Sequence, residues 1–144
     1  MLAAGTWLAT AESCTGGNIA HQITLMPGSS AWFKGGVVSY TNEVKMNVLG
    51  VPSELIDSYT EVSYQVAEAM AKGARRITGA DFAVSTTGIA GPTGATANDP
   101  VGTVYIGVAT PSKVMSSRVV FGTDRQQNID NFTLAALKML LSNI

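Results

Sequence analysis

Charged residues are scarce in this chain of 144 residues, and neither sign predominates. It has 9 Lys and Arg against 10 Asp and Glu, which gives a formal net charge of −1. The basic residues are scattered, whereas a groove that follows a phosphate backbone needs them clustered, so we expect no nucleic-acid partner. A disordered tail is also excluded, because 46% of the residues are hydrophobic and only 13% are charged.

Cysteine and histidine each occur once, as Cys14 and His21. A lone cysteine excludes an internal disulfide and a metal site built from several cysteines. We therefore expect no metal ion and a reducing, cytoplasmic setting. A Ser-His-Asp triad would rest on His21 alone, which falls in the middle of a predicted helix, so we expect this side chain at the surface.

Long apolar runs are absent as well. No stretch approaches the roughly 20 apolar residues of a membrane-spanning helix, so we expect no membrane partner. The apolar opening of the sequence lacks a basic region and is followed by Glu12, so we expect no secretory signal. The length suits one domain, and no repeat or linker interrupts it, so we predict a single domain over residues 1–144.

The hydrophobic pattern alternates between strand-like and helix-like segments. The predicted strands are 5–11, 32–40, 81–87, 101–109 and 113–121; the predicted helices are 18–25, 43–49 (with Asn42 as N-cap), 53–58, one between Ser63 and Gly79, and one after Asp124. In the second strand, Gly35 and Gly36 indicate a bulge or a close backbone approach. Helices between strands predict an α/β fold, a three-layer α/β/α sandwich around a mixed, mostly parallel sheet.

Glycine is plentiful, with 15 residues, and several glycines lie with Ser and Thr in four clusters. Three clusters follow predicted strands: 12–17, 40–45 and 87–94. Ligands collect at the carboxyl ends of parallel strands, so we expect these three segments to form one site. The fourth cluster, 27–30, ends a predicted helix and could fold toward any of them.

Ser13 is a candidate nucleophile, since it lies between a predicted strand and a helix whose first N–H groups could hold an oxyanion. On geometry alone, the alternative that Ser13 or Thr15 is only the helix N-cap is favoured. Serine enzymes without histidine use a neutral lysine or a tyrosine, and Tyr40 and Lys45 fit that chemistry. We expect the helix dipole and partial burial to disfavour the charged form of Lys45, although a surface lysine remains the alternative. For Cys14, a small buried residue is a better interpretation than a nucleophile.

The glycine-rich segment 86–94 is neither a Walker A loop nor a GxGxxG motif. It fits a phosphate or ribose cradle and an ordinary ordered loop equally well. Arg125, just before the last predicted helix, could contact a phosphate through two N–H groups.

Together, six ordered blocks of this sequence closely resemble the CinA C-terminal domain family. They are TAESCTGG (10–17), PGSSAWF (27–33), GGVVSYTNEVK (35–45), VS…AMA (62–71), TGIAGPTG (87–94) and PVGTVYI (100–106). The resemblance runs from about Thr10 to the last predicted helix. It implies a three-layer α/β/α sandwich. It also implies hydrolysis of the carboxamide of nicotinamide mononucleotide to nicotinate mononucleotide and ammonia, without a cofactor.

The resemblance also implies roles for individual residues. The serine of the AESCTGG block, Ser13, would be the nucleophile, and Tyr40 and Lys45 of the YxNxxK block would take its proton. We expect backbone N–H groups at the helix start after Ser13 to hold the oxyanion. The residues that we predict to bind the small nucleotide substrate are Thr15, Gly16, Gly17, Ser30, Asn42, Thr87, Gly88 and Arg125.

The chain departs from the family pattern in several places. The family usually has a helix before its first strand, and this sequence has none there; the sheet face it would cover leads us to expect a homo-oligomer. Ala95 and Asp99 stand where many relatives have glycine and lysine. These departures keep a second interpretation open, a non-catalytic pyridine-nucleotide-binding module of a CinA-like protein.

Overall fold

The computed structural model describes residues 4–144, which form a five-stranded sheet with the strand order β2-β1-β3-β4-β5. The strands are β1 (Leu8–Glu12), β2 (Phe33–Val38), β3 (Phe82–Gly88), β4 (Thr103–Ala109) and β5 (Val114–Val120). β1 pairs in parallel with β2 and β3, whereas β4 is antiparallel to β3 and β5. Within this sheet β4 alone opposes the other strands, which confirms the predicted mixed, mostly parallel arrangement.

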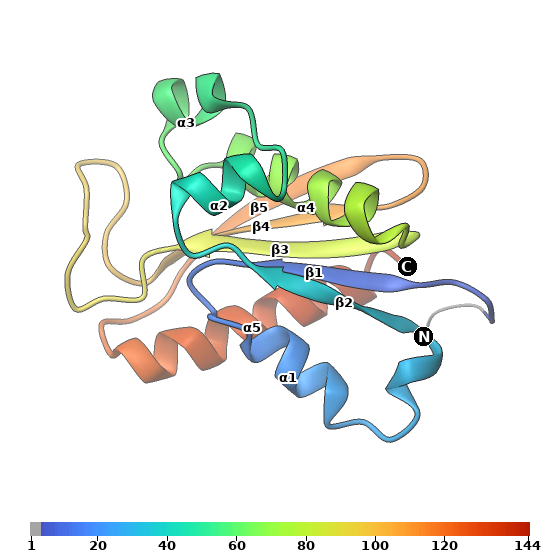
Figure 1. The fold of residues 1–144 in the computed structure, drawn as a ribbon. Coiled ribbons are helices and arrows are strands. Elements are labelled where there is room, and N and C mark those ends of the chain that lie inside the picture. The colour runs from blue at the N-terminus through green and yellow to red at the C-terminus, as the bar shows by residue number, and fades with distance from the viewer. Residues whose placement is uncertain (1–3) are drawn as a thin grey trace.

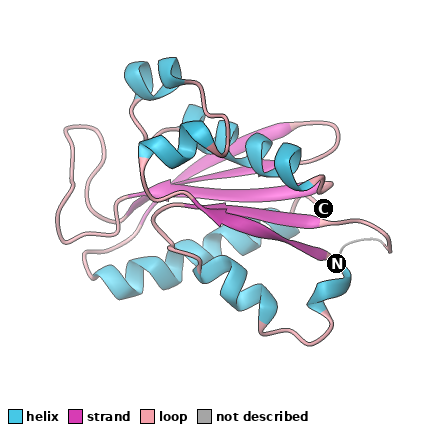
Figure 2. Ribbon diagram, viewed as in Figure 1, coloured by secondary structure: helices cyan, strands magenta, loops and turns pink. Residues whose placement is uncertain are grey.

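Helices cover both faces of the sheet (Figures 1 and 2). They are α1 (Asn18–Thr24), the short 3-10 helix η1 (Ser29–Ala31), α2 (Asn42–Asn47), α3 (Ser53–Tyr59), α4 (Tyr64–Thr78) and α5 (Arg125–Leu141). In Figure 1, α1 and α5 lie on one side of the sheet and α2, α3 and α4 on the other, as the predicted three-layer sandwich requires. Across residues 4–144, no helix is both long and apolar enough to cross a membrane.

The inner strand β1 is buried along its whole length and contributes to both cores. Leu8 packs in the core that contains Ile19 of α1 and Phe132 of α5. Ala9, the next residue, packs in the second core with Met70 of α4. Successive strand residues point to opposite faces, so this alternation decides which helices each later residue of β1 can reach.

The edge strand β2 has the irregularity that its glycines predict. Its register against β1 shifts between Leu8 and Ala9. A Cβ atom on Gly36 would collide with the side-chain oxygen of Thr10. The bulge and the close approach are therefore both present, and they bring β2 tightly against the strand that leads to Ser13.

The N-cap of α2 differs from the prediction by one residue. The side-chain oxygen of Thr41, rather than of Asn42, accepts the N–H of Val44. Threonine satisfies the open N–H groups of a first helical turn well, so either residue could have served from sequence alone. Asn42 instead lines the cavity described below.

Candidate active site

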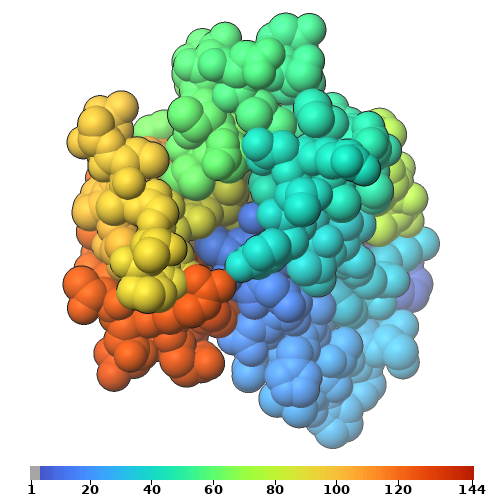
Figure 3. All heavy atoms as spheres, turned by 60° about the vertical axis from the view of Figure 1, so that its left-hand side comes forward, coloured from blue at the N-terminus to red at the C-terminus, as the bar shows by residue number. Residues whose placement is uncertain are grey.

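A cavity of about 370 Å³ opens at the end of the sheet where β1, β2 and β3 end. Figure 3 shows the hollow, with residues of the β1 end at its bottom between the segments near residues 40 and 90. Its lining residues are Ser13, Cys14, Tyr40, Asn42, Lys45, Thr60, Glu61, Val62, Thr87, Gly88, Ile89, Ala90, Gly91, Thr93, Gly94, Thr96 and Arg125. All three clusters that follow strands contribute, and the volume lies in the range of small-molecule sites, roughly 300–1,000 Å³.

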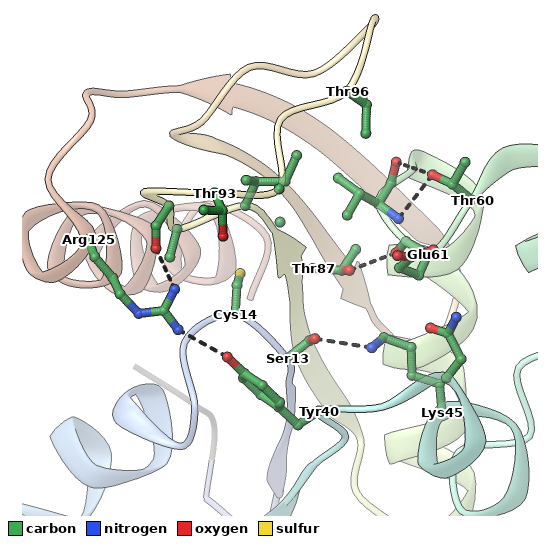
Figure 4. A pocket seen from close by; sticks show the side chains of 17 residues that line it. Ser13, Cys14, Tyr40, Lys45, Thr60, Glu61, Thr87, Thr93, Thr96 and Arg125 are labelled. Atoms are coloured by element: carbon green, nitrogen blue, oxygen red, sulfur yellow. Dashed lines mark hydrogen bonds between the residues drawn. The ribbon is translucent and has the colours of Figure 1, made fainter.

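Ser13 and Lys45 meet inside this cavity. The Nζ atom of Lys45 lies 3.1 Å from the Oγ atom of Ser13 and donates a second hydrogen bond, of 3.0 Å, to the backbone oxygen of Ser39. Figure 4 shows the two side chains pointing toward one another, Ser13 from the turn directly after β1 and Lys45 from α2. The pair has the reach that a serine nucleophile and its base require.

Burial shapes the chemistry of Lys45, whose side chain is only 2% exposed. Burial lowers the pKa of Lys45, while the nearby negative charge of Glu61 partly offsets the effect. The predicted contribution of the helix dipole is wrong, because α2 is short and Lys45 lies in its last turn. There the dipole favours a positive charge, so loss of hydration is what promotes the neutral amine.

The hydroxyl of Tyr40 faces a different partner. It accepts a 3.0 Å hydrogen bond from Nη2 of Arg125, and Nη1 of Arg125 donates to the backbone oxygen of Gly91 (Figure 4). Tyr40 is 59% exposed and lies at the mouth of the cavity. Lys45, and not the Tyr40 hydroxyl, makes the hydrogen bond to Ser13 that the structure shows within residues 4–144.

The start of α1 is occupied by a buried carboxylate. Glu12 accepts the N–H of Ile19 at 2.8 Å, the N–H of Ala20 at 3.0 Å and the hydroxyl of Thr15 at 2.6 Å. These helical N–H groups therefore cannot also hold an oxyanion, which narrows the predicted donors to the turn directly after Ser13. In the described part of the chain, the N–H groups of Cys14 and Thr15 make no backbone hydrogen bond.

Not every predicted substrate-binding residue reaches the cavity. Asn42, Thr87, Gly88 and Arg125 line it; Thr15, Gly16, Gly17 and Ser30 do not. The Thr15 hydroxyl is instead buried against Glu12 and Thr86. Ser30 lies in η1, which precedes β2, so it is placed at the opposite end of the strand from the cavity.

Two residues with reactive side chains take no part in the Ser13–Lys45 contact. Cys14 lines the cavity, but burial raises the pKa of its thiol to about 12, which suits the predicted small buried residue. His21 is exposed on α1, as expected. Among residues 4–144, no group of three His, Cys, Asp or Glu side chains could hold a metal ion.

The turn between α3 and α4 also lines the cavity, through Thr60, Glu61 and Val62. No function was predicted for this turn, which contains no glycine. Thr60 has a positive φ of 69°, although threonine rarely adopts that conformation. The positive φ is the kind of signal that only a structure supplies.

Comparison with known proteins decides the family. A family profile described as the CinA C-terminal domain matches residues 1–144. The chain belongs to the CinA C-terminal domain family. A relative of this CinA domain from Pseudomonas putida, named nicotinamide-nucleotide amidohydrolase PncC, is 48% identical over 132 residues, which are 92% of this chain and 82% of the relative.

Longer proteins also contain this CinA domain. A CinA-like protein of Chloroherpeton thalassium is 49% identical over 140 residues, yet the domain spans only about a third of that relative, 33% of its length. A crystal structure of competence/damage inducible protein CihA from Agrobacterium tumefaciens matches with a TM-score of 0.93 and 41% identity over 96% of this chain and 85% of that one. A CinA superfamily protein from Escherichia coli matches with the same TM-score, 0.93, at 31% identity over 96% and 81% of the two chains.

Proposed function

We propose that this CinA domain hydrolyses the carboxamide of nicotinamide mononucleotide and releases nicotinate mononucleotide and ammonia. The observation that carries the proposal is the buried Nζ atom of Lys45, 3.1 Å from the Oγ atom of Ser13 inside the strand-end cavity. The relative named nicotinamide-nucleotide amidohydrolase supports the choice of substrate, since it shares 48% of the aligned residues.

In the proposed first step, the neutral amine of Lys45 takes the proton of the Ser13 hydroxyl as Oγ attacks the amide carbon. Burial favours this step because it lowers the pKa of Lys45 and so increases the neutral fraction near neutral pH. The negative charge then develops on the carbonyl oxygen. We assign its stabilisation to the N–H group of Cys14, a residue that lines the cavity and whose N–H makes no backbone hydrogen bond in residues 4–144.

Collapse of the tetrahedral intermediate breaks the bond between carbon and nitrogen. Lys45 returns its proton to the leaving nitrogen, so ammonia departs and a nicotinoyl ester on Ser13 remains. A water molecule then attacks the ester carbon while Lys45 takes one of its protons. The bond between that carbon and the Ser13 Oγ atom breaks, Lys45 returns the proton to Oγ, and nicotinate mononucleotide is released. We assign Tyr40 to substrate binding and not to proton transfer, because its hydroxyl accepts a hydrogen bond from Arg125 at the mouth of the cavity.

We assign the phosphate of the substrate to the side of the cavity formed by Arg125 and the glycine-rich loop 88–94. The loop contributes backbone groups at Gly88, Gly91 and Gly94, which let a ligand approach closely. Arg125 reaches this loop through Gly91 and carries a full positive charge. The arrangement leaves Ser13 for the carboxamide at the inner end of the cavity.

The direct test is incubation of the protein with nicotinamide mononucleotide while ammonia and the amide-to-acid change in mass are followed. The Ser13→Ala variant should keep its circular dichroism spectrum and lose at least about 10³-fold in kcat/KM, as in other covalent hydrolases. Lys72→Met, at an exposed position of α4, serves as the control. Full turnover by Ser13→Ala would disprove the serine mechanism.

A second candidate function is binding of a pyridine nucleotide without catalysis. It is favoured by the finding that the domain forms about a third of a longer CinA-like relative, 33% of its length, so that catalysis could reside elsewhere in such a protein. Tight binding of nicotinamide mononucleotide without any release of ammonia would identify this function.

The remaining parts of the proposal concern the setting of the protein. We propose that residues 1–144 act as one domain, that the protein works in the cytoplasm, and that it forms a homo-oligomer. Light scattering at several protein concentrations measures the oligomeric state directly.

A further inference from the structure

Glu61 is the one acidic residue among the side chains that line the cavity in residues 4–144. It lies in the turn between α3 and α4, on the side of the cavity that also holds Lys45 and Thr87 (Figure 4). The opposite side holds Arg125. The cavity therefore has a negative charge near Ser13 and Lys45 and a positive charge at its other side.

The backbone around Glu61 is firmly held. The hydroxyl of Thr87, on β3, donates a 2.6 Å hydrogen bond to the backbone oxygen of Glu61. The Ser63 hydroxyl donates to the backbone oxygen of Thr60 at 3.0 Å, and the same Ser63 side chain caps α4. These bonds fix the backbone of Glu61 between β3 and α4, while its side chain is exposed.

This turn also retains an unfavourable backbone conformation. The φ angle of Thr60 is 69° and its ψ angle is 168°, a combination that essentially only glycine adopts without strain. The Thr60 side chain compensates through hydrogen bonds with the N–H and the C=O of Val62. Strained residues held by their surroundings cluster at functional sites, and here the residue that follows the strained one is Glu61.

The negative charge of Glu61 acts on Lys45 from the same side of the cavity, and this charge bears on the difference between the two forms of a nicotinate ligand. An amide –NH2 group can donate a hydrogen bond to a carboxylate, whereas a second carboxylate can only accept and is repelled. A cationic Lys45 without a neighbouring anion would attract the carboxylate product and retain it beside Ser13.

We propose that Glu61 is the specificity-determining residue that makes this cavity prefer the carboxamide over the corresponding carboxylate. Its carboxylate accepts the amide N–H of the substrate, and after hydrolysis it repels the new carboxylate and so promotes product release. This role rests on the proposed amidase function, and it assigns the amide-binding side of the cavity to the turn before α4.

Two variants separate the charge of Glu61 from its hydrogen-bonding capacity. Glu61→Gln keeps the size of the side chain and an acceptor oxygen but removes the charge, whereas Glu61→Ala removes both. Glu54→Gln, at an exposed position of α3 outside the cavity, is the matched control. All three are made in the Ser13→Ala background, so that both nucleotides can be titrated calorimetrically without turnover.

Glu61→Gln should bind nicotinate mononucleotide about tenfold more tightly than its parent, because a like charge has been removed from a partly solvated site. Its affinity for nicotinamide mononucleotide should change much less. Glu61→Ala should in addition bind nicotinamide mononucleotide more weakly, because it also loses the acceptor oxygen. Glu54→Gln should change the affinity for neither nucleotide. An unchanged preference in a folded Glu61→Gln protein would overturn the inference and leave the amidase proposal intact.

A second readout uses the active enzyme, with Ser13 restored. The negative charge of Glu61 raises the pKa of Lys45, so Glu61→Gln should move the rising limb of kcat/KM toward lower pH. A purely structural role would lower the amplitude without moving the limb. If the preference for the amide depends on Glu61 but no ammonia is released, the amidase function alone is overturned. If the protein binds neither nucleotide, both proposals are overturned.

Discussion

Glu12 and Ser13 are neighbours in the chain, but their side chains interact with helices on opposite faces of the sheet. The Glu12 carboxylate accepts N–H groups at the start of α1, and the Ser13 hydroxyl meets Lys45 of α2. The period of two along a strand produces this separation. Glu12 thus holds the start of α1 in place, while the hydroxyl of Ser13, the proposed nucleophile, faces its proposed base, Lys45.

Glu12→Ala should destabilise the protein without touching the cavity. It would leave the N–H groups of Ile19 and Ala20 and the hydroxyl of Thr15 without their buried acceptor. Loss of such bonds should lower the free energy of unfolding by about 3 kcal/mol, measured by urea denaturation. Glu12→Gln, which keeps an acceptor oxygen, should lose less. Equal stability of Glu12→Ala and the wild type would contradict the capping role.

Lys45→Met should separate activity from stability. Removal of the proposed base should lower kcat by about 10²–10⁴-fold in the ammonia assay. The free energy of unfolding should stay constant or increase, because an apolar chain of similar length replaces a buried amine. Lys72→Met should retain full activity, since Lys72 is exposed on α4. A Lys45→Met protein that is fully active would show that another group takes the Ser13 proton.

The stability of the wild type should depend on pH through Lys45. Burial lowers the pKa of Lys45 in the folded protein, whereas in the unfolded chain it stays near the ordinary value of about 10.4. Between these two values the unfolded chain binds more protons, so stability should rise with pH across that window. The measurement is the difference in the free energy of unfolding between the wild type and Lys45→Met, from neutral pH to about pH 10. A difference that stays flat or falls with pH would refute a lowered pKa.

Much of the fold could be predicted because its signals are local. The Ser63 cap and the terminal Gly79 bound α4 as expected, and the glycine pair of β2 marks its irregularity. The contact between Ser13 and Lys45 could not be predicted from local signals, because these residues are 32 positions apart in the sequence. The sequence could nominate both residues by their chemistry, but the burial of Lys45 beside the strand-end cavity is visible only in the structure.

Three residues of the candidate site or its surroundings were placed wrongly or not predicted from the sequence, each for a physical reason. Ser30 lies in a Gly- and Ser-rich cluster like those of the site, but this cluster precedes a strand instead of following one. Glu61 follows a positive-φ residue that is not glycine, so no composition signal marks its turn. Glu12 was predicted just beyond the first strand, in the cluster 12–17, whereas it is the last residue of β1 and its carboxylate accepts N–H groups in the first turn of α1.

Arg125→Ala tests the proposed placement of the substrate phosphate. Loss of this charge should lower kcat/KM for nicotinamide mononucleotide by about tenfold or more, since bidentate guanidinium contacts to phosphate are among the stronger hydrogen bonds. Arg125→Ala should hydrolyse nicotinamide riboside, which lacks the phosphate, with nearly the same kcat/KM as the wild type has for this riboside. For nicotinamide mononucleotide, the kcat/KM of Arg125→Lys should lie between those of the wild type and Arg125→Ala, because lysine keeps the charge but lacks the planar pair of donors.

The riboside also distinguishes the phosphate contact from a structural role of Arg125. This side chain holds the Tyr40 hydroxyl and the backbone of Gly91, so its removal could disturb the mouth of the cavity as a whole. Such a disturbance would slow both substrates by the same factor. An equal loss for the mononucleotide and the riboside would therefore place the phosphate away from Arg125, whereas a loss confined to the mononucleotide identifies Arg125 as its contact.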